Sequence, residues 1–101
     1  RTLAYCPDTG VCDNAITLAK DANVLISECA FKAGQSCPEW PHLNPESAAG
    51  IAKEAGARKL VLTHFDANIY RTLDERLTAE SRAREIFSNA FVATDGMEIE
   101  V

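Results

Sequence analysis

The stretch that decides the fold is KLVLTHFD at residues 59–66, where a short apolar run ends on a histidine. An apolar run of this length is typical of a buried strand in a parallel sheet. Side chains that bind ligands or carry out catalysis often lie just past the carboxyl end of such strands. His64 is therefore a candidate functional residue at the end of the strand that residues 60–62 predict.

Turn and capping residues divide the rest of the chain into further strands and helices. Strands are predicted at residues 3–5, 24–26, 91–93 and 97–101, and helices at residues 13–22, 45–55 and 72–87. Asp13, Asn44 and Thr72 are the predicted N-terminal caps, because their side chains can accept a hydrogen bond from a free backbone N–H group. The order β-α-β-α-β-α-β-β predicts an α/β fold with a mostly parallel sheet, ending in a hairpin at the Asp-Gly pair of residues 95–96.

Length and composition favour a single domain over residues 1–101 without a membrane span. The net charge of −5 and the pI of about 4.9 argue against a broad basic surface for nucleic acid, but not against a local phosphate site. The apolar runs are far shorter than the ~20 residues that cross a bilayer, and we expect a cytoplasmic protein. The chain opens inside a strand pattern without a starting methionine, so we expect a piece of a larger protein.

Four cysteines occur at positions 6, 12, 29 and 37, and no pair has the C-x-x-C spacing of a zinc knuckle or a redox motif. We expect reduced thiols, since nothing in the sequence indicates secretion. Cys29 follows an apolar run and is predicted to lie in the core.

Four side chains with acid–base or metal-binding chemistry are predicted to meet at one edge of the sheet. Asp8, Glu28 and His64 follow three successive strands, and His42 lies in the loop that returns from the second of them. The carboxyl ends of parallel strands share one edge, which brings these groups together. Asp and His suit zinc, manganese or iron, whereas Glu and His suit proton transfer. The helix that begins after Asp8 would favour an anionic ligand at the same edge.

Each of these residues also has a structural interpretation when it is taken alone. Asp8 is a good turn residue in Pro-Asp-Thr-Gly, and Glu28 could be a solvated strand end. His42 could be a loop histidine next to a proline, and His64 could satisfy a local hydrogen bond. The coincidence of all four at one edge favours a functional site over four separate structural roles.

Four segments of the chain carry a resemblance to a known family. They are YCPDTG at residues 5–10, NVLISECAF at 23–31, HLNPESAAGIAKEAGARKLVLTHF at 42–65 and VATDGMEIEV at 92–101. In this order they resemble the C-terminal half of the metallo-β-lactamase superfamily, closest to its ribonuclease Z-like and phosphodiesterase-like branch. Ser27 stands where that branch often has His, and Asn44 replaces a Thr. The resemblance implies half of an αββα sandwich, in which two sheets pack face to face between helices.

The resemblance also implies a role for each residue of the predicted edge. Asp8 would bridge two metal ions, and His64 would be the last histidine ligand. Glu28 and His42 would be the catalytic pair that assists proton transfer near the leaving group. The implied reaction is metal-assisted hydrolysis, often of a phosphodiester or nucleotide substrate, with zinc as the expected metal and manganese or iron as alternatives.

The main ligand cluster of that family, His-x-His-x-Asp-His, is missing, because the only histidines are His42 and His64. A catalytic zinc usually takes three protein ligands, so Asp8 and His64 alone would not hold a dinuclear centre. We therefore expect a chain that is inactive without the N-terminal half of the fold or a second copy of itself. The apolar sheet face that a lone half would expose predicts an oligomer.

Two other functions fit parts of the pattern. The first is a non-catalytic α/β binding or interaction domain, in which Asp8 and His64 are structural. The second is a response-regulator-like, doubly wound domain, which fits the alternation of strands and helices but neither the terminal hairpin nor the lack of an acidic cluster after the first strand. Metal binding through Asp8 and His64 in the presence of a partner would distinguish the hydrolase from the binding domain.

Overall fold

The computed structural model describes residues 1–7, 11–35 and 42–101, which form a four-stranded sheet and three helices. The strands are β1 (Leu3–Cys6), β2 (Val24–Glu28), β3 (Leu60–Thr63) and β4 (Ala90–Val92), and the helices are α1 (Asp13–Ala19), α2 (Pro45–Ala55) and α3 (Leu73–Arg84). All neighbouring strands pair in parallel, in the order β1-β2-β3-β4. The predicted parallel sheet with alternating helices is confirmed.

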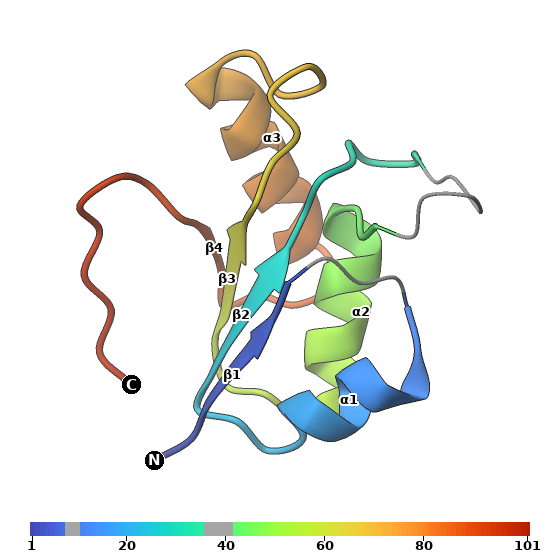
Figure 1. The fold of residues 1–101 in the computed structure, drawn as a ribbon, viewed down its shortest axis with the longest axis vertical. Helices are drawn as coiled ribbons and strands as arrows, with labels where there is room; N and C mark the ends of the chain where they lie inside the picture. Colours follow the sequence, from blue (N-terminus) through green and yellow to red (C-terminus); the bar gives the residue numbers. More distant parts are fainter. Residues whose placement is uncertain (8–10, 36–41) are drawn as a thin grey trace.

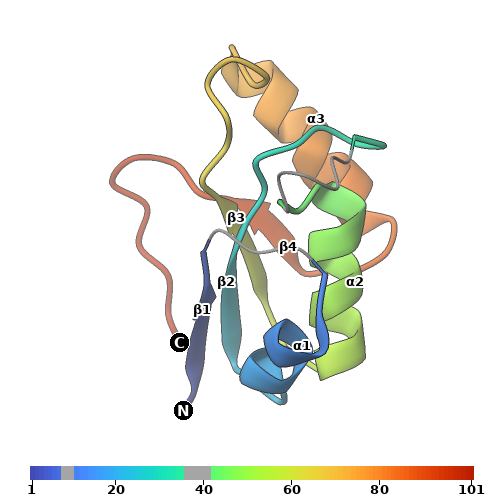
Figure 2. The same ribbon diagram turned by 45° about the vertical axis from the view of Figure 1, so that its right-hand side comes forward.

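All three helices lie on the same face of the sheet (Figure 1 and Figure 2). Each crossover moves one strand along in the same direction, and right-handed crossovers of this kind place every helix on the same side. The strand order has no switch point, unlike that of a doubly wound domain with helices on both faces. This topology excludes the response-regulator-like interpretation.

Helix α2 forms where its capping residues predict. Asn44 Oδ1 accepts a hydrogen bond from the Ser47 backbone N–H at 2.8 Å, and the Ser47 hydroxyl accepts one from the Asn44 N–H at 2.9 Å. Pro45 occupies the first helical position, where a backbone N–H has no helical partner in any case. Gly56 ends the helix at a φ of 73°, a left-handed conformation that glycine adopts without strain. This firm start fixes the backbone just after His42.

The other two helices differ in detail from the prediction. The predicted cap Asp13 is instead the first helical residue of α1, because the extended backbone of the cap position belongs to Cys12. A carboxylate in the first turn still stabilises a helix through the positive end of its dipole. In α3 the predicted cap Thr72 does accept a hydrogen bond from the Glu75 N–H, at 3.2 Å. Both helices end earlier than predicted, α3 at Arg84.

Small side chains allow the helices to pack closely on the sheet. The core on this face combines leucines of β2 and β3 with alanines of the helices. Its fully buried members include Leu25, Leu60, Leu62, Ala19, Ala48 and Ala52. Cys29 is also fully buried, as predicted. Helix α2 contacts both other helices and so joins them into one layer.

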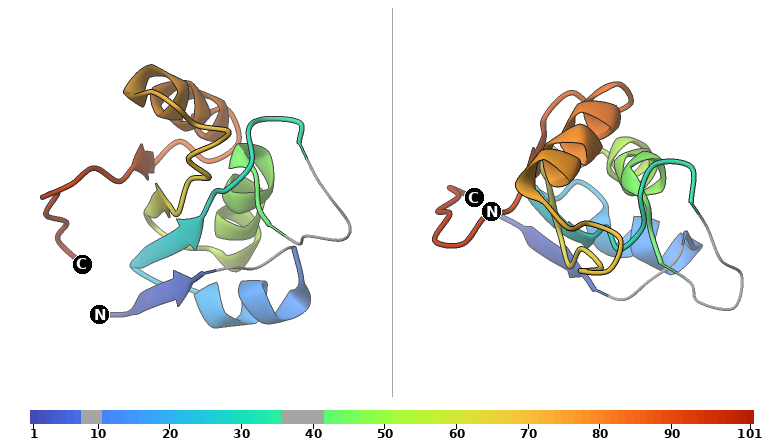
Figure 3. Two further views of the ribbon diagram at one scale, coloured as in Figure 1. Left: turned by 45° about the horizontal axis from the view of Figure 1, so that its top comes forward. Right: turned by 90° about the horizontal axis from the view of Figure 1, so that it is seen from above.

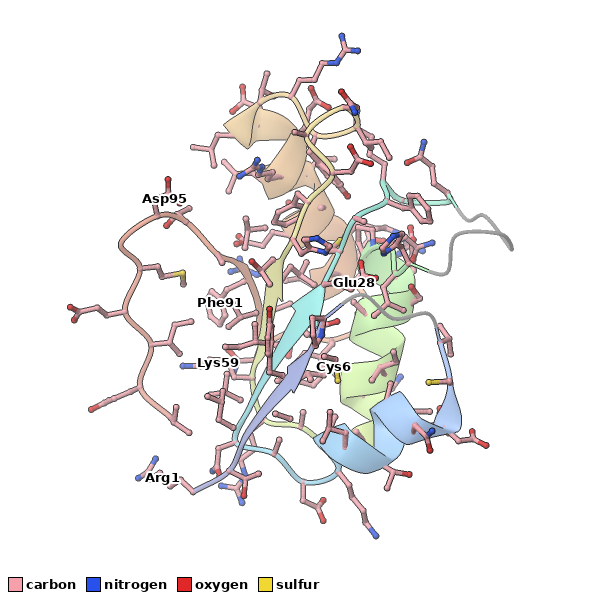
Figure 4. The ribbon with its side chains drawn as sticks, viewed as in Figure 1. Arg1, Cys6, Glu28, Lys59, Phe91 and Asp95 are labelled. Atoms are coloured by element: carbon pink, nitrogen blue, oxygen red, sulfur yellow. The ribbon has the colours of Figure 1, made fainter. Side chains whose placement is uncertain are left out.

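The opposite face of the sheet is only partly covered. Leu3 and Tyr5 of β1 are 53% and 57% exposed there, as expected for an open apolar face. Residues 93–101 run beside the β4 side of this face, and the two ends of the chain come close together (Figure 3). Figure 4 shows Lys59 and Phe91 on the side of the sheet next to this segment. A cavity of about 120 Å³ separates the segment from the strands.

The terminal hairpin that the sequence predicts does not form. Its turn is present, with Gly96 at a φ of 79° and a hydrogen bond of 3.0 Å from the Met97 N–H to the Thr94 carbonyl. No strand follows β4 in the described part of the chain, however. The reason lies at the outer edge of β4.

Two side chains of α3 already occupy the outer backbone groups of β4. The Val92 N–H donates to Glu80 Oε2 at 2.8 Å, and Arg84 Nε donates to the Ala90 carbonyl at 2.8 Å. Glu80 and Arg84 also pair with each other at 3.2 Å, one helical turn apart. An antiparallel partner would need the same N–H and carbonyl groups, so the segment after β4 turns away instead of pairing. Covering an edge strand in this way also limits edge-to-edge association.

A buried tyrosine anchors the segment that follows β2. Tyr70 is 2% exposed, and its hydroxyl donates to the Phe31 carbonyl at 2.6 Å. The Cys29 thiol donates to the same carbonyl at 3.7 Å and lies 3.8 Å from the Tyr70 hydroxyl. Burial raises the pKa of Cys29 from 9.0 to about 12 and raises the pKa of Tyr70 as well. Both groups therefore stay protonated at neutral pH.

The described helices include none that is both long and apolar enough to cross a membrane.

The contact between Glu80 and the outer side of β4 predicts that Glu80→Ala destabilises the fold. The substitution leaves the Val92 N–H without its acceptor, so the free energy of unfolding should fall by about 1 kcal/mol, and self-association should increase at the freed edge. Urea titration and sedimentation velocity measure the two effects. Glu54→Ala, at an exposed position of α2, is the matched control and should stay within about 0.5 kcal/mol of wild type. Equal effects of both substitutions would contradict the edge role.

Stability should fall at alkaline pH, because Cys29 ionises more easily in the unfolded chain. Its pKa rises on folding from 9.0 to about 12, so the thiol is neutral in both states well below pH 9. Between the two values the unfolded state releases a proton that the folded state keeps. The free energy of unfolding should then fall by about 1.4 kcal/mol per pH unit on account of this group.

Denaturant titrations from about pH 8 to about pH 11 measure this slope. Cys29→Ala should make the slope shallower, with buried Tyr70 still contributing near the upper end of the range, whereas Cys12→Ala, at an exposed position, should change it much less. Identical slopes in the wild type and in Cys29→Ala would show that the buried thiol does not control the alkaline limit.

Candidate functional site

Parallel pairing brings the carboxyl ends of β2 and β3 to the same edge of the sheet. Glu28, the last residue of β2, is in register with Thr63, the last residue of β3. The Cys29 N–H donates to the Thr63 carbonyl at 2.8 Å and extends this pairing by one residue. Figure 4 shows Glu28 at the tip of β2, and His64 follows directly after β3. The carboxylate and the imidazole of the predicted site therefore start from adjacent strands.

Asp8 lies outside the described residues, and its role as a metal ligand stays a prediction. β1 ends at Cys6, which is in register with Ser27, the residue before Glu28. The chain therefore leaves β1 at the same edge of the sheet at which it leaves β2 and β3.

Glu28 is a fully buried carboxylate, and each of its oxygens meets a polar group of the protein. Its exposed fraction is 0%, Oε1 lies 2.8 Å from His42 Nδ1, and Oε2 accepts from the Ala30 N–H at 2.9 Å. A buried carboxylate without such partners would be strongly destabilising. The interpretation of Glu28 as a solvated strand end is wrong.

The contact with Glu28 orients the His42 ring. An ionised carboxylate would accept a hydrogen bond at Oε1 and so favour the His42 tautomer that carries its proton on Nδ1, with Nε2 on the other side of the ring. The Phe31 ring contacts the imidazole edge to face, with centroids 5.6 Å apart and planes at 87°. The next residue, Leu43, is fully buried, and its carbonyl accepts from the Phe31 N–H at 3.1 Å. The His42 side chain remains 25% exposed, so solvent can reach it.

His64 has a strained backbone at the end of β3. Its φ of 56° lies in the left-handed region, which a non-glycine residue adopts at a cost of about 1–3 kcal/mol. Strain of this kind is concentrated at functional sites. The His64 ring lies beside the His42 ring, with centroids 6.2 Å apart at an angle of 60°. Glu28, His42 and His64 are thus brought together at one edge, as the sequence predicts.

The described residues do not complete a metal centre. Within the ranges 1–7, 11–35 and 42–101, no three His, Cys, Asp or Glu side chains are grouped so that they could hold a metal ion. Both Glu28 oxygens have contacts within the protein, and of the two histidines the family resemblance assigns the metal to the His64 imidazole. Its chemistry fits zinc, manganese or iron, but a catalytic zinc usually takes three protein ligands.

A cavity of about 230 Å³ lies next to this region, between the segment after β2 and α3. Tyr70, Lys32 and Glu75 are among the residues that line it. Lys32 Nζ lies 2.5 Å from Glu75 Oε2, and this hydrogen bond lowers the pKa of the Glu75 carboxyl. Glu28, His42 and His64 are not among the residues that line this cavity. The cavity is therefore distinct from the candidate site at the carboxyl ends of β2 and β3.

Two residues that support the site cannot be identified from the sequence pattern. Phe31 contacts the His42 ring, and Tyr70 reaches the Phe31 carbonyl from a position 39 residues later in the chain. The sequence shows only that an aromatic residue follows β2 and another follows β3. That pattern does not indicate that Phe31 and Tyr70 contact each other.

Comparison with known proteins connects this geometry to a family. Residues 1–65 match the family model described as "Beta-lactamase superfamily domain". Ribonuclease Z of Gemmatimonas aurantiaca is 39% identical over 103 residues, covering 100% of this chain but 32% of that protein. The chain therefore spans about a third of the length of the curated relatives that it matches.

Solved structures show the same relationship. The metallo-beta-lactamase fold protein YhfI from Bacillus subtilis superimposes with a TM-score of 0.81 at 33% identity, over 94% of this chain and 38% of that one. The short form of human tRNase Z superimposes with a TM-score of 0.61 at 29% identity, over 89% of this chain and 29% of that one. Since the family model takes in well over half of the residues and the fold agrees, the chain belongs to the beta-lactamase superfamily.

Proposed function

We propose that this chain provides the proton-transfer pair and the last metal-binding histidine of a metal-dependent hydrolase that acts on phosphodiesters. The observation that carries the proposal is the contact of 2.8 Å between buried Glu28 and His42, beside the His64 ring. Burying such a pair costs desolvation energy and adds little stability compared with apolar packing. A domain that only binds a partner does not need such a pair at the carboxyl ends of its strands, whereas an enzyme that transfers a proton does.

The pair acts on a proton at Nε2 of His42. Glu28 holds the Nδ1–H and so sets the tautomer and the orientation of the ring. In the imidazolium form, which gains its second proton from solvent at Nε2, the ring donates that proton to the oxygen that leaves the phosphorus and returns to the Nδ1–H tautomer. This donation matters most when the leaving group is a strongly basic alkoxide, such as the sugar oxygen of a nucleic acid.

A metal ion bound at this edge would supply a hydroxide nucleophile and stabilise the charge that develops on the phosphoryl group. His64 and Asp8 are the residues of this chain that would hold it, Asp8 on the strength of the sequence alone. Zinc is the expected metal, and manganese and iron suit the same ligand types.

The names of the relatives support RNA as the substrate class. One is a ribonuclease Z and another is a tRNase Z. The chain carries a net charge of −5, so it would bind phosphate locally at the strand edge rather than over a broad basic surface.

The complete activity requires more protein than this chain. The relatives are about three times as long, and the described residues do not group into a metal centre. Leu3 and Tyr5 leave an apolar patch on the open sheet face that further protein would cover. The remaining segment of a longer protein is the proposed partner, and a second copy of the chain is the alternative.

Metal content tests whether the chain is incomplete. We expect well under one zinc ion per isolated 101-residue chain. In a longer protein that contains this chain and has about the length of the relatives, we expect about two. His64→Asn in the longer protein should lower that content, since asparagine tolerates the left-handed backbone but lacks the imidazole. Elemental analysis of dialysed protein measures it. About one or more ions in the isolated chain would show that copies assemble a site between them.

Leaving-group chemistry tests the role of His42 in the completed protein. His42→Ala should lower kcat for RNA by roughly 10²- to 10⁴-fold, because the sugar oxygen must then leave without a proton. A diester with a nitrophenolate leaving group needs no such proton and should be hydrolysed at close to the wild-type rate. Glu28→Gln, which keeps the shape and removes the charge, should act in the same direction but less strongly.

Glu54→Gln, on the exposed surface of α2, is the matched control and should change neither rate. Equal losses on both substrates after His42→Ala would contradict proton transfer and indicate a structural role for the ring.

A further inference from the structure

Phe31 connects three parts of the site. Its ring contacts the His42 imidazole, with centroids 5.6 Å apart. Its N–H donates to the carbonyl of Leu43, the residue after His42, at 3.1 Å. It follows Glu28 by three residues in a segment where the Ala30 N–H donates to the Glu28 carboxylate at 2.9 Å. A shift of Phe31 would therefore move the His42 ring relative to its carboxylate.

The Phe31 carbonyl is held by Tyr70. The Tyr70 hydroxyl donates to it at 2.6 Å and is deeply buried. A buried hydroxyl is destabilising unless it is bonded, and a phenylalanine would fill the same space without that requirement. The hydroxyl therefore has a specific task, which is to fix the position of this carbonyl.

Tyr70 is itself fixed to the segment that carries His64. Its N–H donates to the Asp66 carbonyl at 2.7 Å, and its ring contacts the ring of Phe65, the residue after His64, at 4.8 Å between centroids. The Asp66 N–H donates to the Ala30 carbonyl at 3.3 Å and closes the link from the other side. Tyr70 thus bridges the connection after β3 and the connection after β2.

We propose that Tyr70 is a positioning residue, whose hydroxyl fixes Phe31 and, through Phe31, holds the His42 imidazole in register with Glu28 and His64. The inference rests on the proposed function for its catalytic consequence, but its structural part can be measured separately. Tyr70 itself does not touch the reacting atoms.

Tyr70→Phe tests the inference, because it removes one hydroxyl and keeps the ring that lines the neighbouring cavity. The first readout is the Nδ1–H signal of His42 in ¹H–¹⁵N spectra of the 101-residue chain and of the longer protein. We expect this signal to shift or broaden in Tyr70→Phe, while the circular dichroism spectrum stays unchanged. Tyr5→Phe, at a tyrosine that is 57% exposed, is the matched control and should leave the signal as in wild type.

The second readout is kinetic and uses the longer protein. Tyr70→Phe should lower kcat for RNA by roughly tenfold to a hundredfold, with KM and the rate on the nitrophenyl diester within about twofold of wild type. Phe31→Leu, which keeps the apolar bulk but removes the ring contact, should show the same selective loss.

The two readouts separate failure of this inference from failure of the proposed function. An unchanged His42 signal in Tyr70→Phe overturns the positioning role, whatever the kinetics show. A changed signal without any loss of kcat, together with a neutral His42→Ala, supports the positioning role and rejects proton transfer by His42. Parallel losses on both diesters would reduce Tyr70 to a general structural residue and overturn the inference.

Discussion

The site depends on one buried contact, the one between Glu28 and His42. A carboxylate with no exposed surface must find a partner for each oxygen, and Glu28 finds them in the His42 ring and in the Ala30 N–H. These two contacts hold the segment after β2, which carries Ala30, and the residues just before α2, which include His42. The His64 ring then lies beside the pair because its backbone turns through a left-handed conformation at the end of β3. Local strain and a buried carboxylate are both destabilising, and together they support the proposal that the carboxyl ends of β2 and β3 carry the chemistry.

Topology explains why this edge and the open sheet face occur in the same molecule. Every crossover runs in the same direction, so all three helices cover the same face and all strands end at the same edge. Leu3 and Tyr5 are therefore exposed on the other face of the sheet. The last residues of the chain run along this face beside β4. The relatives, about three times as long, have further protein with which to cover such a face. One architectural rule therefore accounts for both the convergence of the site residues and the open face of the sheet.

Local signals in the sequence predicted the parts of this structure that local forces determine. The apolar runs predicted the parallel strands, and Asn44, Pro45 and Gly56 predicted both ends of α2. Strand order then predicted that Glu28 and His64 would share an edge, while Asp8 lies outside the described residues and stays a prediction. The terminal hairpin was wrong because its outcome depends on Glu80 and Arg84, which take the outer groups of β4 from a helix distant in sequence. The Tyr70–Phe31 contact escaped prediction for the same reason, since a hydrogen bond across 39 residues has no local signature.

We infer that the Glu28–His42 pair is already formed in this chain, before any metal or further protein completes the site. The most direct test is the ¹⁵N state of the His42 ring in the isolated 101-residue chain, measured at neutral pH for the wild type and for Glu28→Gln. We expect a single Nδ1–H species in the wild type, with a slowly exchanging proton shifted far downfield, and loss of that signature in Glu28→Gln. Rapid exchange between the two tautomers in the wild type, unchanged by Glu28→Gln, would show that Glu28 does not hold the His42 ring in the isolated chain.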